Sequence, residues 1–286
     1  MTFFIRFIVL FSFFCVYHGA YSSSFRISPE ELNKTLNSSS FIILDARSFK
    51  EYKKGHIPGA LNFPISLTYE NKQLNGKISA PYTIQSLFRT LGLNVNNSVI
   101  VYDNGELADA ARLFWVLEVY GLKHVRVLNH GYDQWLRLNY PDNTIIPQVK
   151  PSNYIATVNH KHLASKFTTL LATRNTNQII IDARPKAAYT GKTSTARRFG
   201  HIPTAINVPS AHNISYSNGI AGFKQLNELG NLYQNIDKDK KVIIYCAVGR
   251  VSATNYLALR ELGYDVSNYD ASWKEWGNDF KLPIEK

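Results

Sequence analysis

The chain has 286 residues, of which 45% are hydrophobic and 13% aromatic, and it carries a formal net charge of +11. This composition can bury a sizeable core, so it excludes a disordered chain, and the length suits one large domain or two of ordinary size. The basic residues are scattered and no nucleic-acid-binding motif accompanies them. We therefore expect no nucleic acid partner and predict a small anionic substrate in a basic cleft.

The N-terminus has the outline of a secretory signal peptide. One basic residue, Arg6, precedes a short apolar run from Phe7 to Tyr17, and small residues follow as far as Ser24. Because the run is too short to span a membrane comfortably, we assign residues 1–22 to a cleaved signal peptide and expect no stable membrane insertion afterwards. The expected location is the secretory pathway or the outside of the cell; an uncleaved anchor, a buried first element and a mitochondrial transit peptide are the alternatives. Glycosylation sequons agree with the secretory route and begin at Asn33, Asn37, Asn96 and Asn213.

Downstream of this segment, short apolar runs alternate with a helical pattern. Strands are predicted at Phe41–Asp45, Val99–Asp103 and Val125–Leu128, and a helix is predicted at Leu107–Tyr120 between the last two strands. Strands that alternate with helices favour a parallel sheet covered on both faces. The segment from 141 to 151 holds several prolines and little periodicity, so we predict domains at residues 25–140 and 158–286 joined by a linker at residues 141–157.

The chain repeats itself, and the second domain is predicted to be a copy of the first. Four segments recur in the same order: Ile42–Arg47 as Ile179–Arg184, Gly55–Pro64 as Gly200–Pro209, Ser98–Asp103 as Lys241–Cys246, and Gly131–Trp135 as Ser272–Trp276. Ordered matches over this length indicate a tandem duplication of one domain and exclude a solenoid of short repeats.

Several residues that both copies share have structural interpretations. Asp45 and Asp182 each end a predicted strand, and we expect the carboxylate to cap the following turn or to pair with the arginine two residues later. The other shared residues are expected to hold turns by hydrogen bonds or to fill the core: His56 and His201 within Gly-His-Ile-Pro, and Trp135 and Trp276.

Cys246 stands where the first copy has Asp103. A predicted strand at Val242–Tyr245 runs straight into this cysteine, and a helical pattern begins near Ser252. Open α/β sheets place ligand sites at this end of their strands, and the loop amides and helix dipole favour an anion such as a thiolate. Signal cleavage would remove Cys15 and leave Cys246 without an internal disulfide partner. We interpret Cys246 as a nucleophile, with an inert buried thiol as the alternative.

Taken in order, the motifs Asp-Ala-Arg and Gly-His-Ile-Pro and the strand–cysteine loop followed by Asn268–Trp276 resemble the tandem-domain rhodanese family. That family comprises thiosulfate and 3-mercaptopyruvate sulfurtransferases, and the resemblance covers almost everything from about Phe25 to Lys286. It implies an α/β fold of two tandem rhodanese domains, each a small parallel sheet with helices on both faces. It also implies that only the C-terminal domain is catalytic.

The family chemistry implies a two-step sulfur relay. The Cys246 thiolate takes the outer sulfur of a small anionic donor, thiosulfate or 3-mercaptopyruvate, and the resulting persulfide passes it to cyanide or a thiol acceptor. The loop amides, the helix N-terminus and Arg250 all favour the charged thiol. The sulfur travels on the protein, so no metal and no organic cofactor is expected.

Substrate-binding roles are predicted for four arginines. The guanidinium of Arg250 can bind an oxyanion or a carboxylate, and a salt bridge that only holds the loop is its alternative. Arg197 and Arg198 lie in an insertion at 189–199 that borders the cleft in the family, with a solvated surface as the alternative. Arg184 completes the set. Gly249 and Ser252 are expected to orient the loop, and for Ser252 we favour a helix cap.

The residues of the loop leave the donor and the rival functions open. The sequence Cys246–Ser252 matches neither the usual mercaptopyruvate loop nor the vertebrate-like thiosulfate loop, and we predict thiosulfate ahead of 3-mercaptopyruvate. A cysteine phosphatase would need Cys-x5-Arg, whereas Arg250 comes only four residues after Cys246. The remaining alternative is a secreted rhodanese-like binding or redox module without physiological turnover.

Overall fold

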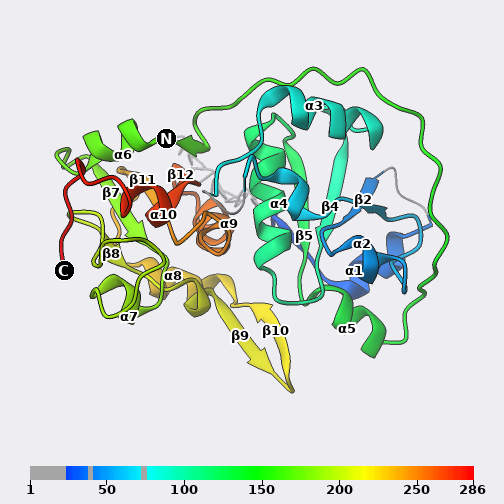
Figure 1. Ribbon diagram of the computed structural model, residues 1–286. Coiled ribbons are helices and arrows are strands. Elements are labelled where there is room, and N and C mark those ends of the chain that lie inside the picture. Colours follow the sequence, from blue (N-terminus) through cyan, green and yellow to red (C-terminus); the bar gives the residue numbers. More distant parts are fainter. Residues whose placement is uncertain (1–23, 38–40, 72–75) are drawn as a thin grey trace, which may run out of the picture.

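The computed structural model describes residues 24–37, 41–71 and 76–286, which form two similar α/β halves lying side by side (Figure 1). We call them the N-terminal domain, ending at Arg137, and the C-terminal domain, beginning at Leu163. The expected signal peptide and Cys15 lie outside the described residues. Within the described ranges, no helix has the length and apolar character that crossing a membrane requires.

The N-terminal domain contains a sheet of five parallel strands in the order β1-β5-β4-β2-β3. Helices α1 and α5 pack on one face of this sheet, and α3 and α4 pack on the other. The elements in chain order are β1 (Arg26–Ile27), α1 (Pro29–Thr35), β2 (Phe41–Asp45), α2 (Phe49–Tyr52), β3 (Leu61–Asn62), the 3-10 helix η1 (Ile65–Thr68), α3 (Pro81–Thr90), β4 (Ser98–Tyr102), α4 (Ala108–Val119), β5 (His124–Leu128) and α5 (Gly131–Arg137).

The C-terminal domain repeats this plan with a parallel sheet in the order β6-β12-β11-β7-β8. Helices α8 and α9 lie on the face toward the N-terminal domain, and α6 and α10 lie on the outer face. The elements are β6 (Leu163–Ala164), α6 (Lys166–Ala172), β7 (Gln178–Asp182), α7 (Lys186–Tyr189), β8 (Ile206–Asn207), the 3-10 helix η2 (Ser210–Asn213), β9 (Ile214–Ser217), β10 (Ile220–Phe223), α8 (Leu226–Tyr233), β11 (Lys241–Tyr245), α9 (Ser252–Glu261), β12 (Val266–Tyr269) and α10 (Ser272–Trp276).

The antiparallel hairpin β9–β10 extends from the C-terminal domain and reaches the N-terminal domain (Figure 1). The amide of Phe223 donates a hydrogen bond to Asn129 Oδ1 at 2.9 Å, and Arg26 Nη1 donates to the carbonyl of Lys224 at 2.9 Å. His130 Nδ1 lies 2.9 Å from the carbonyl oxygen of Ala221. The hairpin therefore ties the two domains together outside their main contact.

The central helices α4 and α9 pack against each other between the two sheets. A single apolar cluster runs through them from one sheet to the other, and each domain keeps a smaller cluster on its outer face. Neighbouring residues of a strand alternate between these clusters, as Ile43 and Leu44 of β2 do, which explains why both are apolar. Each central helix is followed by a glycine with positive φ, Gly121 after α4 and Gly263 after α9.

The predicted architecture, two tandem parallel sheets with helices on both faces, is confirmed. The predicted strands and the helix at Leu107–Tyr120 are present to within two residues, and Asp103 falls just after its strand. Residues 138–162, which include the predicted linker, form no helix or strand apart from one bridge between Asn143 and His56. This segment runs along the outside of the N-terminal domain (Figure 1).

The structural interpretations of the shared residues are also confirmed. Asp45 accepts hydrogen bonds from the backbone amide of Arg47 at 2.9 Å and from its Nε at 3.0 Å, and Asp182 accepts the same pair from Arg184. Each carboxylate therefore both caps the following turn and pairs with the arginine. The histidines bond to backbone carbonyls and the tryptophans are fully buried: His56 and His201, and Trp135 and Trp276.

Candidate active site

Cys246 is the first residue after β11, the middle strand of the C-terminal sheet. Its backbone amide donates to Ser272 Oγ at 3.1 Å, and its carbonyl accepts from the amide of Trp273 at 3.0 Å. Both bonds come from the turn that follows the neighbouring strand β12, so the start of α10 fixes the position of the cysteine. The side chain is buried, with 1% of the residue exposed.

The cysteine loop, residues 246–252, turns sharply at Gly249. This residue has φ +67°, and a Cβ there would collide with the carbonyl oxygen of Asp270, so only glycine fits without strain. Within the described part of the chain, the backbone N–H groups of residues 247–251 have no hydrogen-bond acceptor. In this part of the chain, the loop between the cysteine and the N-terminal end of α9 therefore holds unused backbone donors.

Ser252 helps to hold the cysteine loop in place, but it is not the N-cap of α9. The N-cap residue of α9 is Val251, and no side chain caps it. The Ser252 hydroxyl is completely buried and donates to Asn268 Oδ1 at 2.9 Å, while Asn268 Nδ2 bonds the carbonyl of Gly249 at 3.3 Å. The expected cap is wrong because this hydroxyl is turned toward β12. Ser252 instead contacts the loop through Asn268.

The equivalent loop of the N-terminal domain, the aspartate loop (residues 103–110), shows what such amides bind. The Asp103 carboxylate accepts four backbone N–H bonds at 2.8 to 3.1 Å, from Gly105, Leu107, Asp109 and Ala110. Burial raises the pKa of Asp103 to about 6, and the hydrogen bonds from the loop amides oppose that rise. At neutral pH the aspartate loop therefore encloses an anion of its own.

Arg250 points away from the C-terminal domain and meets the first domain. Its Nε forms an ion pair with Asp109 of α4, its Nη2 lies 3.6 Å from Glu106, and 31% of the side chain is exposed. It borders a cavity of about 460 Å³ at the carboxyl ends of the N-terminal strands, whose other lining residues include Arg47, Asp103 and Asn104. The ion pair is the contact expected of a residue that holds the loop, and substrate binding by Arg250 stays a prediction.

The other three predicted arginines occupy different environments. Arg184 is buried against Asp182, and its guanidinium lies 4.4 Å from the Trp273 ring. Its Nη1 is buried and has no hydrogen-bond partner among the described residues. Arg198 donates to the carbonyls of residues 276, 277, 279 and 282, so it clamps the C-terminal segment. Arg197 is exposed, and its backbone amide donates to Asn278 Oδ1. Substrate binding by these three also stays a prediction.

The N-terminal domain covers the cysteine loop with residues that the sequence did not single out. The amide of Ile78 donates to Asp270 Oδ2 at 2.5 Å, and a Cβ on Gly76 would collide with the carbonyl oxygen of Val248. Burial raises the pKa of Asp270 to about 6. Arg112, fully buried in α4, donates from Nη1 to the carbonyl of Gly249 at 2.8 Å. The available signal was an arginine in a helix whose other buried residues, apart from Glu118, are apolar.

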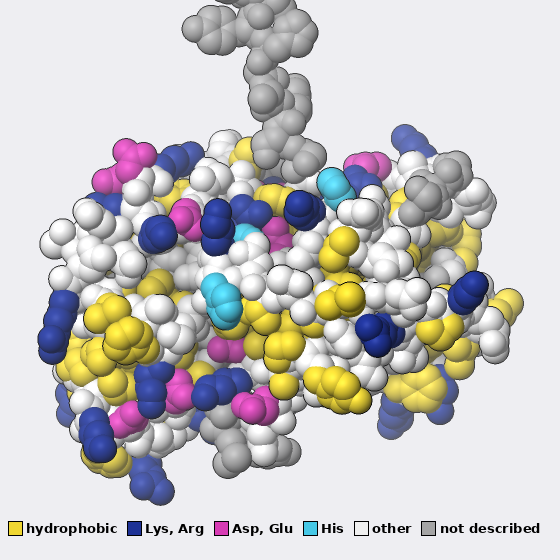
Figure 2. Space-filling model, turned by 90° about the horizontal axis from the view of Figure 1, so that it is seen from above, with side chains coloured by type: hydrophobic (Ala, Val, Ile, Leu, Met, Phe, Trp, Pro, Cys, Tyr) yellow, Lys and Arg dark blue, Asp and Glu magenta, His cyan; other side chains and the backbone are white. Residues whose placement is uncertain are grey.

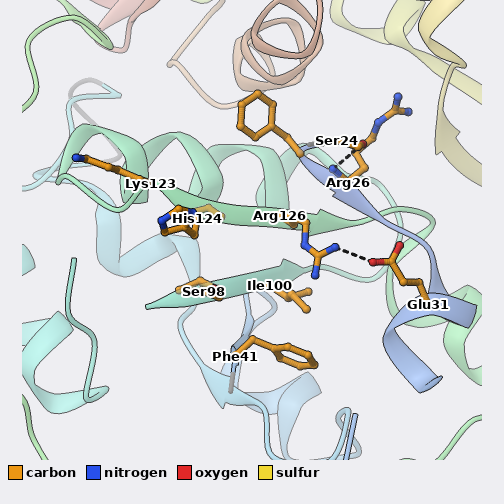
Figure 3. Close-up of a pocket in the computed structure, with 12 residues that line it drawn as sticks. Ser24, Arg26, Glu31, Phe41, Ser98, Ile100, Lys123, His124 and Arg126 are labelled. Carbon is orange, nitrogen blue, oxygen red and sulfur yellow. Dashed lines mark hydrogen bonds and ion pairs between the residues drawn. The ribbon is translucent and has the colours of Figure 1, made fainter. Parts of the chain in front are cut away.

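A second cavity, of about 450 Å³, lies at the opposite edge of the N-terminal sheet, where β4 begins at Ser98 and β5 begins at His124 (Figure 3). Arg126 and Glu31 form an ion pair of 2.7 Å there. Because catalytic loops in parallel sheets follow the carboxyl ends of the strands, this cavity is separate from the cysteine site.

Two further properties of the surface and the site bear on cofactors and partners. Across residues 24–37, 41–71 and 76–286, no group of three or more His, Cys, Asp or Glu side chains could hold a metal ion. On the face that Figure 2 shows, Lys and Arg side chains lie dispersed among acidic and neutral ones.

Comparison with known proteins identifies relatives over most of the chain. The family described as a rhodanese-like domain matches residues 28–138 and again residues 164–279. The 3-mercaptopyruvate sulfurtransferase of Escherichia coli K12 is 33% identical over 250 residues, covering 84% of this chain and 87% of that protein. The thiosulfate sulfurtransferase of Azotobacter vinelandii is 30% identical over 267 residues, covering 91% and 96%. The crystal structure of SseA from Escherichia coli, described as a 3-mercaptopyruvate sulfotransferase, has a TM-score of 0.78 at 29% identity and covers 88% of this chain and 99% of that one.

Proposed function

This chain belongs to the rhodanese family, and on that basis we propose that it is a sulfurtransferase that carries a sulfane sulfur as a persulfide on Cys246. The observation that supports this most strongly is the pair of loops. The aspartate loop holds a carboxylate with four amides, whereas the amides of residues 247–251, which follow the cysteine, have no acceptor among the described residues. Such amides stabilise a thiolate, its persulfide and the charge that develops between them.

The proposed reaction balances without a metal or a redox cofactor. The Cys246 thiolate attacks the outer sulfur of thiosulfate, the sulfur–sulfur bond of the donor breaks, and sulfite leaves with the electron pair. The persulfide anion then gives its terminal sulfur to cyanide, which yields thiocyanate and restores the thiolate. A thiol acceptor would take the sulfur in the same way and leave as its own persulfide.

We place thiosulfate ahead of 3-mercaptopyruvate as the donor. The Escherichia coli and Azotobacter vinelandii relatives are split between these two donors, so the likeness does not select one. Arg250 adds a cation within four residues of Cys246, and a dianion such as thiosulfate gains more from it than a monocarboxylate does.

The test is production of thiocyanate from thiosulfate and cyanide by the parent protein and by Cys246→Ser. We expect turnover by the parent and none above background by the variant, because a hydroxyl cannot form the persulfide. Equal rates for the two proteins would overturn the proposal. Comparing kcat/KM for the two donors at a fixed cyanide concentration then decides between them, and a higher value for 3-mercaptopyruvate would make that compound the preferred donor.

A binding or redox module without turnover is the second candidate, and the burial of Cys246 favours it. In that case a persulfide formed with a polysulfide would persist on the protein, and adding cyanide or a thiol would release less than one equivalent. Mass spectrometry of the intact chain before and after the acceptor distinguishes a stable persulfide from a turning enzyme.

We also propose secretion after cleavage near residue 22, with mitochondrial import as the alternative. Of the sequons, Asn96 is exposed, whereas Asn213 is completely buried and accepts a hydrogen bond from Tyr233 at 2.7 Å. A secreted chain is therefore expected to carry glycan at Asn96 and none at Asn213. N-terminal sequencing and peptide mapping of the protein expressed in a eukaryotic host test both points.

A further inference from the structure

Arg112 is a fully buried arginine of the N-terminal domain that touches the catalytic loop of the other domain. It lies in α4, and none of its surface is exposed. Its Nη1 donates to the carbonyl of Gly249 at 2.8 Å, its Nη2 to the carbonyl of Gly76 at 3.0 Å, and its Nε lies 3.4 Å from Thr68 Oγ1. Tyr69 stacks on the guanidinium, with 3.8 Å between the guanidinium carbon and the ring centroid.

Each guanidinium nitrogen of Arg112 has one hydrogen-bond acceptor, but among the described residues no carboxylate forms an ion pair with it. Among the residues that the structure describes, its acceptors are two carbonyls and a hydroxyl. A buried cation without an anion is costly, and arginine does not escape that cost by losing its proton. Burial lowers the pKa of Arg112, and Tyr69, Asp270, Cys246 and Asp109, in that order, oppose that fall. The negative charge that balances Arg112 must therefore come from nearby acidic groups with which it forms no direct ion pair.

Two of the acidic groups near Arg112 are already engaged elsewhere. Asp109 pairs with Arg250. The carboxylate of Asp270 accepts the backbone amides of Ile78 and Ala271, at 2.5 and 2.9 Å. Asp270 still supplies negative charge to Arg112, and a Cys246 thiolate would be a further anion on the loop whose Gly249 carbonyl this guanidinium holds.

We propose that Arg112 is a positioning residue for sulfur transfer, through which the N-terminal domain stabilises the anionic forms of Cys246 and holds the cysteine loop in its turn. This inference rests on the proposed function, since it assigns a second role within the same site. The C-terminal domain brings the nucleophile, and the other domain brings the buried cation that the nucleophile needs.

The hydrogen bond to Gly249 gives Arg112 its second effect. Gly249 adopts a left-handed backbone, and its carbonyl is held by Arg112 and Asn268. The aspartate loop also has positive-φ residues, Gly105 and Leu107, and both of their amides donate to the carboxylate. Holding the Gly249 carbonyl therefore fixes the left-handed turn of the cysteine loop.

The test follows how fast Cys246 reacts with iodoacetamide as the pH is raised, in full-length proteins that all carry Cys15→Ser. The plateau rate at high pH reports access to the buried thiol, and the midpoint reports its ionisation, so the two effects separate. Arg112→Gln removes the charge, and we expect its midpoint to move up by about one pH unit or more relative to the parent. Arg112→Lys restores a cation and should bring the midpoint back toward that of the parent.

Arg260→Gln is the matched control. Arg260 also crosses the domain contact, where it bonds Glu118 of α4 at 2.8 Å, but its contacts do not include the cysteine loop. A loosened interface raises the plateau in this control and leaves the midpoint in place. An unshifted midpoint in a folded Arg112→Gln protein, or an equal shift in Arg260→Gln, would overturn the proposal.

A second measurement leaves Arg112 unchanged, so it tests the proposal even if the Arg112→Gln protein does not fold. If the guanidinium is balanced by the thiolate, more of the thiol is ionised in the folded chain than in the unfolded chain. The free energy of unfolding of the parent relative to Cys246→Ser should then rise between about pH 7 and pH 9. A flat difference contradicts the proposal. Alkylation and unfolding use no sulfur donor, so either result stands even if the chain turns over neither thiosulfate nor 3-mercaptopyruvate.

Discussion

The two domains place different side chains at the same point of the same fold. Asp103 follows β4 and Cys246 follows β11, and both strands lie at the middle of their sheets. The aspartate loop uses its amides on its own carboxylate, whereas the described residues offer no acceptor to the amides of residues 247–251 in the cysteine loop. The first loop is a completed anion site inside the protein. The second is the same kind of loop with a thiol in place of the carboxylate.

This difference explains how the duplication divides the work. In the N-terminal domain the carboxylate stabilises the loop without any ligand, so that domain serves as a rigid wall. The wall then supplies Arg112 and the segment at residues 76–79 to the cysteine loop. The C-terminal domain carries the thiol, and its neighbour provides groups that contact the cysteine loop.

The largest effect is expected from converting one loop into the other. Cys246→Asp should lose sulfur transfer by at least about a thousandfold, because no persulfide can form. Its carboxyl group should accept the loop amides as that of Asp103 does, so at about pH 5 we expect the variant to be more stable than Cys246→Ser by about 1.5 kcal/mol, an advantage that shrinks as the pH rises. Urea unfolding and the thiocyanate assay measure the two effects. An aspartate variant less stable than the serine variant would show that the two loops do not bind anions alike.

Replacing glycine by alanine should have different effects in the turn of the cysteine loop and at the end of helix α9. Gly249→Ala meets both the left-handed backbone and the carbonyl of Asp270, and we expect losses of about 3 kcal/mol in stability and roughly 100-fold in kcat/KM. Gly263→Ala at the end of α9 has a similar φ, +82°, with no atom within 4 Å of the added Cβ. It should cost only about 1 to 2 kcal/mol and leave kcat unchanged. Thermal unfolding and steady-state kinetics of both variants test the contrast, which fails if the two lose equal activity.

The titration of Asp103 gives the aspartate loop its own pH signature. Its folded pKa of about 6 lies above that of the unfolded chain, so the stability it contributes is present at low pH and is lost as the pH rises through about 6. Between about pH 4 and pH 7 we expect the free energy of unfolding of the parent to fall by up to roughly 3 kcal/mol relative to Asp103→Asn. Urea unfolding at several pH values measures this difference. A difference that stays constant, or that grows in favour of the parent, would contradict the direction of the shift.

The smallest effect concerns the ion pair between the loops. Asp109→Asn leaves Arg250 without its main carboxylate, and because this pair is partly exposed we expect a change in stability below about 1 kcal/mol. If Arg250 binds the donor, its release should lower the KM for thiosulfate by about threefold, and Arg250→Gln should raise it. Initial-rate kinetics decide the point. Unchanged KM values in both variants would leave Arg250 as a residue that only joins the domains.

The residue pattern by itself determined the duplication, the sheet architecture and the position of Cys246. These follow from local information: apolar strands of regular spacing, a repeated Asp-Ala-Arg and Gly-His-Ile-Pro, and a cysteine at the junction of a strand and a helix. The same information anticipated the Asp45–Arg47 pair, since the two residues are only two positions apart.

The tertiary structure alone decided which groups surround the thiol. Arg112 and Gly249 are 137 positions apart in the sequence, and Ile78 and Asp270 are 192 apart. Arg250, close to Cys246 in sequence, turns to Asp109 of the other domain, and the Ser252 hydroxyl turns to Asn268. Sequence spacing predicts contacts within a turn of the chain, whereas these contacts exist only because α4 and α9 bring two copies of one domain face to face.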